Sequence, residues 1–217
     1  MTLFNLDTPK QVKTASSFRF KTAELGVFST SETRPVLADF EKGVRLIGLS
    51  QGKFSLIDLI HGILKKTGPA HVACCTWSAG IKDAHQIKWM MDSDLMLSFK
   101  LLTDHSYSTR QKKYAVSIED LFGKENIRTS ETHAKYTLIH NEEFKVTVRT
   151  SMNLNANKTC ETFEIDEDDR IFDFYMDFVE HTFGTMPKGF ESSSFKANKS
   201  LNQFFSVNKN MQQWSEI

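Results

Sequence analysis

The sequence predicts an α/β domain, a layered sheet flanked by helices, because two kinds of segment alternate along it. Short apolar runs, typical of buried strands, occupy residues 44–49, 70–77 and 95–102. Segments with apolar residues at helical spacing follow them at residues 55–66, 83–91 and 107–122. Strands that alternate with helices pack as layers, with the helices against the sheet.

The ends of these segments carry the signals expected of helix and strand boundaries. The helix at 55–66 has Lys65 and Lys66 in its last turn, and Gly68-Pro69 ends it. The helix at 107–122 ends at Gly123.

The last predicted elements close the domain. A strand at 162–165 leads into the acidic turn 166–169, whose carboxylates suit a helix N-terminus, and an amphipathic helix follows at 171–184. The sequence therefore predicts a domain over residues 43–184. Polar segments flank it, and we expect an N-terminal arm over residues 1–42 and a C-terminal polar tail over residues 185–217.

Composition limits the partners and the environment of the protein. The 27 Lys and Arg residues balance 27 Asp and Glu, which argues against a general nucleic-acid coat protein but allows a local basic site. Three cysteines make no disulfide framework, so we expect a reduced, cytoplasmic setting in a bacterium or phage. No apolar stretch approaches about 18 residues, and we expect no membrane span.

A predicted hairpin carries the residues with chemical potential. Its arms, residues 131–139 and 144–153, alternate between apolar even positions and polar odd positions, which predicts one apolar and one polar face. A three-residue turn at 141–143 would place His133 opposite Ser151, and Lys135 opposite Arg149. A histidine, two cations and a hydroxyl on one face, with the Asn153 amide beside them, form a set that can hold a phosphate.

These residues resemble a known motif. His133-Ala-Lys135, then Ser151-Met-Asn153, then Glu161 are similar to the HKD motif of the phospholipase D superfamily, and the order of elements upstream is similar to that fold. The resemblance implies a phospholipase D-like layered sheet and a phosphodiesterase that needs neither metal nor cofactor. Family members with a single motif per chain are mostly small nucleases, so the resemblance also implies nucleic acid as substrate.

The resemblance assigns a role to each residue of the motif. His133 would be the nucleophile or the general acid, Lys135 and Asn153 would hold phosphoryl oxygens, Ser151 would add a hydrogen bond, and Glu161 would orient a histidine. The chemistry is consistent, since an imidazole can attack phosphorus to give a phosphohistidine and cations stabilise the charge that builds on the oxygens. A second histidine can protonate the leaving oxygen near neutral pH.

Two positions depart from the motif, and one half of it is missing. His140 stands where the family has aspartate, and Thr150 stands where glycine precedes the serine. Family sites are built from two motifs, and this chain has one, so the resemblance implies a homodimer in which two His133 residues meet across a two-fold axis. The departures leave a second function open: a catalytically degenerate relative that binds nucleic acid or serves as a structural or interaction subunit.

Three more residues are candidates for substrate binding. Arg149 lies on the predicted polar face as a phosphate contact. Trp77 closes the second predicted strand, at the end where α/β sheets bind ligands, and either stacks on a base, shapes the pocket or packs in the core. Asp104 follows the third predicted strand and either lines the site or caps a helix. Arg110 with Lys112-Lys113 forms either a solvated helix face or a track for nucleic acid.

Overall fold

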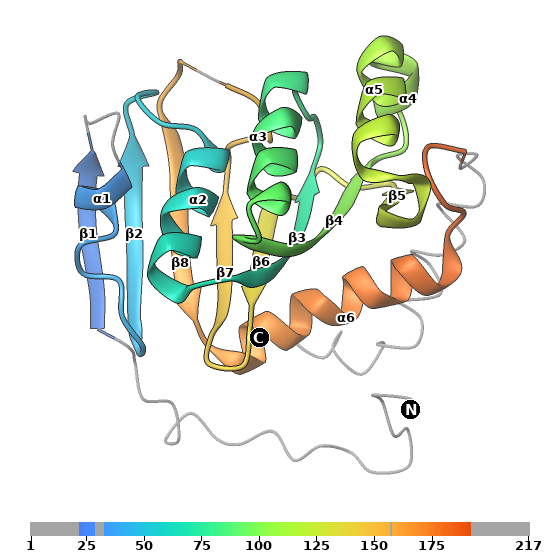
Figure 1. Cartoon of the computed structure of the whole chain (residues 1–217). Helices are drawn as coiled ribbons and strands as arrows, with labels where there is room; N and C mark the ends of the chain where they lie inside the picture. The colour runs from blue at the N-terminus through green and yellow to red at the C-terminus, as the bar shows by residue number, and fades with distance from the viewer. Residues whose placement is uncertain (1–21, 29–32, 157, 192–217) are drawn as a thin grey trace, which may run out of the picture.

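The computed structural model describes residues 22–28, 33–156 and 158–191, and its centre is one mixed sheet (Figure 1). The eight strands are β1 (Thr22–Phe28), β2 (Val44–Ser50), β3 (Ala70–Thr76), β4 (Met96–Asp104), β5 (Ile127–Ser130), β6 (Tyr136–His140), β7 (Lys145–Thr150) and β8 (Glu161–Glu167). The helices are α1 (Thr33–Val36), α2 (Leu56–Thr67), α3 (Ile81–Asp92), α4 (Tyr107–Arg110), α5 (Lys112–Phe122), the 3₁₀-helix η2 (Lys124–Asn126) and α6 (Asp169–Thr185).

The strands form three blocks within the sheet, in the order β1-β2-β8-β7-β6-β3-β4-β5. The first block is the parallel pair β1–β2, and the last is the parallel set β3-β4-β5. Between them, β8, β7 and β6 each run antiparallel to both neighbours. The predicted α/β class, a layered sheet flanked by helices, is confirmed.

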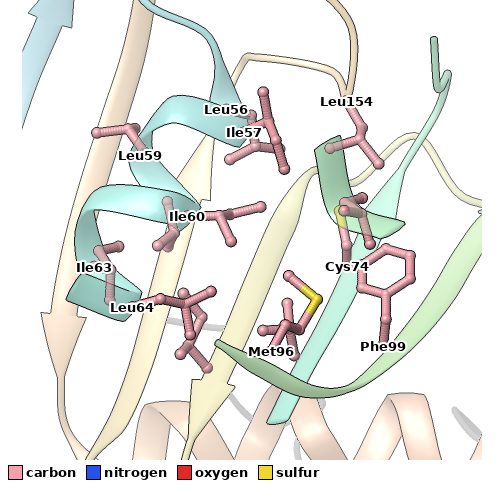
Figure 2. Close-up of a cluster of buried hydrophobic side chains, with 14 of the residues drawn as sticks. Leu56, Ile57, Leu59, Ile60, Ile63, Leu64, Cys74, Met96, Phe99 and Leu154 are labelled. Atoms are coloured by element: carbon pink, nitrogen blue, oxygen red, sulfur yellow. The ribbon is translucent and has the colours of Figure 1, made fainter. Parts of the chain in front are cut away.

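Helices cover both faces of the sheet and enclose a core on each side. The larger core lies under α2, α3 and α5, where the apolar stripe of α2 that the sequence predicts is fully buried (Figure 2). Figure 2 shows Leu56, Ile57 and Ile60 on the side of α2 that faces Cys74 and Phe99. The smaller core joins Tyr136 and Leu138 to Phe172 and Val179 of α6. Each large aliphatic side chain buried this way stabilises the fold by about 1.5–3 kcal/mol.

The predicted register of the β6–β7 hairpin is wrong by one residue. Tyr136 lies opposite Arg149 and His140 lies opposite Lys145, so residues 141–144 form the turn instead of residues 141–143. The side-chain oxygen of Asn141 accepts hydrogen bonds from two N–H groups inside the turn, at 3.0 and 2.9 Å, which fixes the longer connection.

The corrected register also overturns the prediction of one apolar and one polar face. Cross-strand partners share a face, so Leu138 lies beside Thr147 while Ile139 lies beside Val146 on the other side of the sheet. All four side chains are buried, because the hairpin is central in the sheet and helices cover both of its faces.

Other differences concern short or interrupted elements. The first predicted arm of the hairpin begins too early: β5 ends at Ser130, and residues 131–135 form a loop before β6. The predicted helix at 107–122 is broken at Gln111, whose φ of −128° is not helical. The strand β5 has four residues, too few to give a periodic signal.

The flanks of the predicted domain contribute to the sheet and to its helices. Within the predicted arm, residues 22–28 form β1, which pairs in parallel with β2 and which was not predicted from the sequence. After α6, the Phe190 ring packs 5.5 Å from the ring of Tyr107. The rest of the arm, residues 1–21 and 29–32, and the predicted tail beyond residue 191 lie outside the described residues. Among the described helices, none is long and apolar enough to cross a membrane.

A close approach at Gly52 ties the β2–α2 loop to the loop between β7 and β8. Gly52 has a φ of +68°, and a Cβ there would lie 2.2 Å from the carbonyl oxygen of Lys158. Gly43 has a similar φ of +85°, but a Cβ there would meet nothing within 4 Å. Gly43 therefore isolates the cost of backbone strain.

We predict that Gly52→Ala destabilises the protein more than Gly43→Ala. Gly43→Ala should cost about 1–2 kcal/mol of strain, and Gly52→Ala about 1–3 kcal/mol more, because the backbone of the second loop must move. Urea denaturation of both variants measures the difference. Equal losses would contradict the close contact between the two loops.

Candidate functional site

Several loops that follow or precede strands meet at one edge of the sheet, the upper edge in Figure 1. The parallel strands β3 and β4 end there, and because β6 runs antiparallel to β3, its first residue lies at the same edge. By the same pairing, β7 ends and β8 begins there. The structure thus gathers at this edge the loop with His133 and Lys135, the loop with Ser151 and Asn153, and the start of β8 at Glu161.

His133 and Lys135 contact each other in the loop before β6. The Lys135 ammonium lies 3.3 Å from Nδ1 of His133 and donates to the carbonyl oxygen of His133 at 3.0 Å. The His133 side chain is exposed, whereas Lys135 is half-buried. Burial lowers the pKa of Lys135, and the nearby Cys75 and Glu161 oppose that shift. The ammonium is therefore partly desolvated, which strengthens its attraction for an anion.

Ser151 and Glu161 form a second contact at the same edge. The Ser151 hydroxyl donates to the Glu161 carboxylate, and it accepts from the N–H of Thr162 at 2.9 Å. The hydroxyl of Thr159 donates to the other carboxylate oxygen of Glu161 at 3.2 Å. These contacts fix the carboxylate that the motif assigns to orienting a histidine.

The Thr76 hydroxyl links Asn153 to the end of β3. This buried hydroxyl lies 2.8 Å from the carbonyl oxygen of Ser78 and 3.4 Å from the side-chain oxygen of Asn153, as a donor to both. It also accepts from the N–H of Leu154 at 3.1 Å. This contact directs the side-chain oxygen of Asn153 toward Thr76, so the amide N–H groups of Asn153 can donate to another group. Sequence reasoning missed Thr76, since only the fold brings it to Asn153.

Trp77 lies beside the histidine. Its ring centroid is 5.3 Å from that of His133, with the rings tilted by 51°. The guanidinium carbon of Arg110 lies 3.7 Å from the centroid of the Trp77 ring. Trp77 is therefore half-buried at this edge, in contact with both His133 and Arg110.

Asp104 acts within its own turn. Its carboxylate accepts from the N–H of Ser106 at 2.9 Å and from the Ser106 hydroxyl, and it lies 3.5 Å from Nδ1 of His105. The N-cap of α4 is Ser106, not Asp104. Asp104 therefore stabilises the loop that follows β4, whereas Trp77 belongs to the loop that follows β3.

Arg149 lies on a different side of the hairpin from the one predicted. It shares a face with Tyr136 and forms an ion pair with Glu164, its cross-strand neighbour. The one-residue change in register separates it from Lys135, whose carbonyl oxygen instead accepts from the N–H of Thr150 at 3.2 Å.

The two departures from the motif have structural roles. Thr150 braces β7 against β8, since its hydroxyl donates to the carbonyl oxygen of Thr162 at 2.6 Å and accepts from the N–H of Met152. His140 ends β6 at the opposite edge of the sheet, with its ring 5.2 Å from that of His71. Burial lowers the pKa of His140, and the charges of His71, Lys100 and Lys145 lower it further.

Other possible sites lie apart from these residues. In residues 22–28, 33–156 and 158–191, no group of three or more His, Cys, Asp or Glu side chains could hold a metal ion. A groove over α5, between Lys112 and Phe190, includes none of the predicted site residues.

The described residues form a phospholipase D-like α/β fold, as the resemblance implied. The structure is similar to that of Nuc from Salmonella typhimurium, a phospholipase D family member, with 13% identity and a TM-score of 0.50 over 66% of this chain and 96% of that one. NucT from Helicobacter pylori is 12% identical, with a TM-score of 0.48 over 66% of this chain and 99% of that one.

The comparison with solved structures also matches a longer protein. A polyphosphate kinase from Porphyromonas gingivalis is 11% identical, with a TM-score of 0.47 over 82% of this chain and 31% of that one. No family model matches the chain, and no curated protein matches it in sequence.

We predict that Thr76→Val destabilises the protein and that Thr129→Val does not. Both hydroxyls are fully buried at this edge, but that of Thr129 has no hydrogen-bond partner among the described residues. Thr76→Val removes one of the two acceptors of the Leu154 N–H, which keeps the carbonyl oxygen of Ser78 at 3.1 Å, and should cost about 0.5–1.5 kcal/mol. Thr129→Val should stay within about 0.5 kcal/mol of the wild type. Denaturation curves, with hydrogen exchange at Leu154, test the pair, and equal costs would refute the link.

We predict that His140→Asp, which restores the residue of the motif, is more stable at pH 7 than His140→Asn. A carboxylate there would face Lys100 and Lys145 and should contribute up to about 1 kcal/mol relative to His140→Asn. The lowered pKa of His140 means that the neutral ring supports the fold above pH 6.5 and that this support is lost as the pH falls through the folded pKa. Both variants should therefore lose less stability than the wild type below pH 6.5.

Urea midpoints between pH 5 and 8 measure these differences. A His140→Asp protein that is less stable than His140→Asn at pH 7 would show that the site does not favour an anion.

Proposed function

We propose that the protein is a metal-independent phosphodiesterase, specifically a nuclease, which works through a phosphohistidine on His133 in a homodimeric site. The observation that carries the proposal is the His133–Lys135 contact, at the same edge as the Ser151–Glu161 pair and the Asn153 amide. This set contains a nucleophile, a desolvated cation, a fixed carboxylate and amide donors, which are the groups that a two-step displacement at phosphorus uses.

In the proposed first step, Nε2 of His133 attacks the phosphorus of the substrate and the bond to the leaving oxygen breaks. Attack by Nε2 requires a free lone pair there, so Nδ1 must carry the ring proton and needs an acceptor. In the motif, Glu161 is that acceptor for a histidine. The Lys135 ammonium, which lies against Nδ1 in the free protein, would move to the phosphoryl oxygens.

The proposed first step also needs a proton donor. The leaving oxygen takes up a proton while His133 gives its lone pair to phosphorus, so a group other than His133 must donate that proton. One motif per chain supplies one such histidine, and the His133 of the partner subunit would act as the general acid. In the proposed second step, water attacks the phosphohistidine and releases the product. That same imidazole would then take the proton from the attacking water.

Three side chains would complete the substrate site. Trp77 would hold the His133 ring from one side, and Asp104 would fix the loop that lies next to it. Arg149 would contribute positive charge near the site only if substrate competes with Glu164 for its guanidinium.

We predict that the wild-type protein cleaves single- or double-stranded DNA, RNA or bis(p-nitrophenyl) phosphate in the presence of EDTA. His133→Ala should lower kcat by about 10³-fold or more, because the covalent route is lost, and Lys135→Met by about 10²–10³-fold. His85→Ala, at an exposed histidine of α3, is the matched control and should keep full activity. Equal rates for wild type and His133→Ala on all substrates would end the proposal.

The same proteins test the dimer. If each site needs two His133 residues, an equal mixture of wild type and His133→Ala that has exchanged subunits should retain about a quarter of the activity of the undiluted wild type. Independent monomers would retain about a half.

A second function, that of a degenerate protein that binds nucleic acid, predicts a different result. Salt-dependent DNA binding without turnover, unchanged in His133→Ala and reduced in Lys135→Ala, would support it.

A further inference from the structure

Arg110, at the end of α4, is held over Trp77 by three contacts. Its guanidinium carbon lies 3.7 Å from the centroid of the indole, and its Nη2 donates to the carbonyl oxygen of Trp77 at 3.0 Å. Its Nε donates to the hydroxyl of Ser106 at 2.9 Å. The side chain is nevertheless exposed. An exposed arginine that is fixed in place loses little conformational entropy when it binds an anion.

The contacts of Arg110 rest on a rigid base. Ser106 donates to the buried carboxylate of Asp104, so the Ser106 hydroxyl is held in position to accept from Arg110. The hydroxyl of Tyr107, at the start of the same helix, donates to the carbonyl oxygen of Ala79 at 2.7 Å. Both ends of α4 are therefore attached to the loop that follows β3.

Arg110 is linked to a carboxylate indirectly, through the Ser106 hydroxyl that donates to Asp104. Arg45 and Arg149 instead form direct ion pairs, with Asp166 and Glu164. None of the ion pairs formed within the described ranges includes Arg110. Its donors go to a carbonyl, a hydroxyl and an aromatic face, all of which leave the positive charge available to an external anion.

The position of this charge relates it to the proposed chemistry. The Trp77 ring contacts both Arg110 and the proposed nucleophile His133, so a single indole links the guanidinium to the imidazole. Arg110 covers one face of the indole, and a base could not stack on that face. The anion nearest to His133 on a polymer, other than the scissile phosphate, is the neighbouring phosphate of the strand.

We propose that Arg110 binds the phosphate that neighbours the scissile phosphate on a single nucleic-acid strand and, through Trp77, positions His133. This inference rests on the proposed function and specifies its substrate as a polymer. A small phosphodiester has no neighbouring phosphate to occupy Arg110. Two more exposed cations, Lys112 and Lys113, follow Arg110 in the chain at the start of α5.

The first test measures binding without turnover. In a His133→Ala background, the affinity for a fluorescent single-stranded 12-nucleotide DNA is followed as the salt concentration rises. Arg110→Gln should weaken binding and reduce the slope of log K against log salt by about 0.7, the value for one lost phosphate contact. Arg110→Lys should keep the slope, because it keeps the charge. The control is Arg170→Gln, an exposed arginine at the start of α6, which should behave as the parent.

The second test separates phosphate binding from support of the fold. In the otherwise wild-type protein, Arg110→Gln should lower kcat/KM for the oligonucleotide at least about tenfold more than kcat/KM for bis(p-nitrophenyl) phosphate, mainly through KM. Equal losses on both substrates with an unchanged salt slope would show a purely structural role and overturn the proposal. A parent protein that binds no oligonucleotide would overturn it as well. A wild type that binds DNA with an Arg110-dependent slope but cleaves nothing would refute the proposed function and leave the phosphate contact standing.

Discussion

The antiparallel pairing of β6 with β3 is the constraint on which the site depends. Five residue pairs join the two strands, from Cys75–Tyr136 to His71–His140. Because β6 runs opposite to β3, the loop that enters β6 lies at the edge where β3 and β4 end. The segment with His133 and Lys135 is therefore placed beside Trp77, although more than fifty residues separate them in the chain. A parallel β6 would have placed the same segment at the opposite edge, next to His71.

Burial on both faces makes this arrangement specific. Leu138 packs in the core under α6, while Ile139 packs in the core under α2 and α3, and both side chains are fully buried. A slip of one residue in β6 would exchange the two faces along the whole strand and disturb both cores. The register is therefore determined by packing that lies outside the hairpin, and the position of Lys135 relative to Thr150 follows from it.

Burial of the hairpin on both faces also explains which parts of the fold and of the site the sequence could predict. Apolar runs and helical spacing locate β2, α2, β3, α3, β4 and α6 to within a few residues, since these signals are local. The motif residues His133, Lys135, Ser151, Asn153 and Glu161 are brought to one edge, as the resemblance implies. The hairpin register and the placement of Arg149 were wrong, because a rule of alternating faces applies to a sheet with one open face, and this hairpin has none. Arg110 could not be assigned, because its contact with Trp77 depends on how α4 packs.

The charges at the edge are arranged so that a neutral chain can still attract an anion. Two carboxylates lie there: Asp104 accepts from Ser106, and Glu161 accepts from Ser151 and Thr159. The cations Lys135 and Arg110 take part in none of the ion pairs of the described chain. Two other cations of the sheet, Arg45 and Arg149, pair directly with Asp166 and Glu164. At the edge, Glu161 acts on the charge of Lys135 without a direct ion pair to it in the described chain, and Asp104 is linked to Arg110 through the Ser106 hydroxyl. A balanced total of charged residues is therefore compatible with a local site for phosphate, because what decides binding is which partners the charges at the site have.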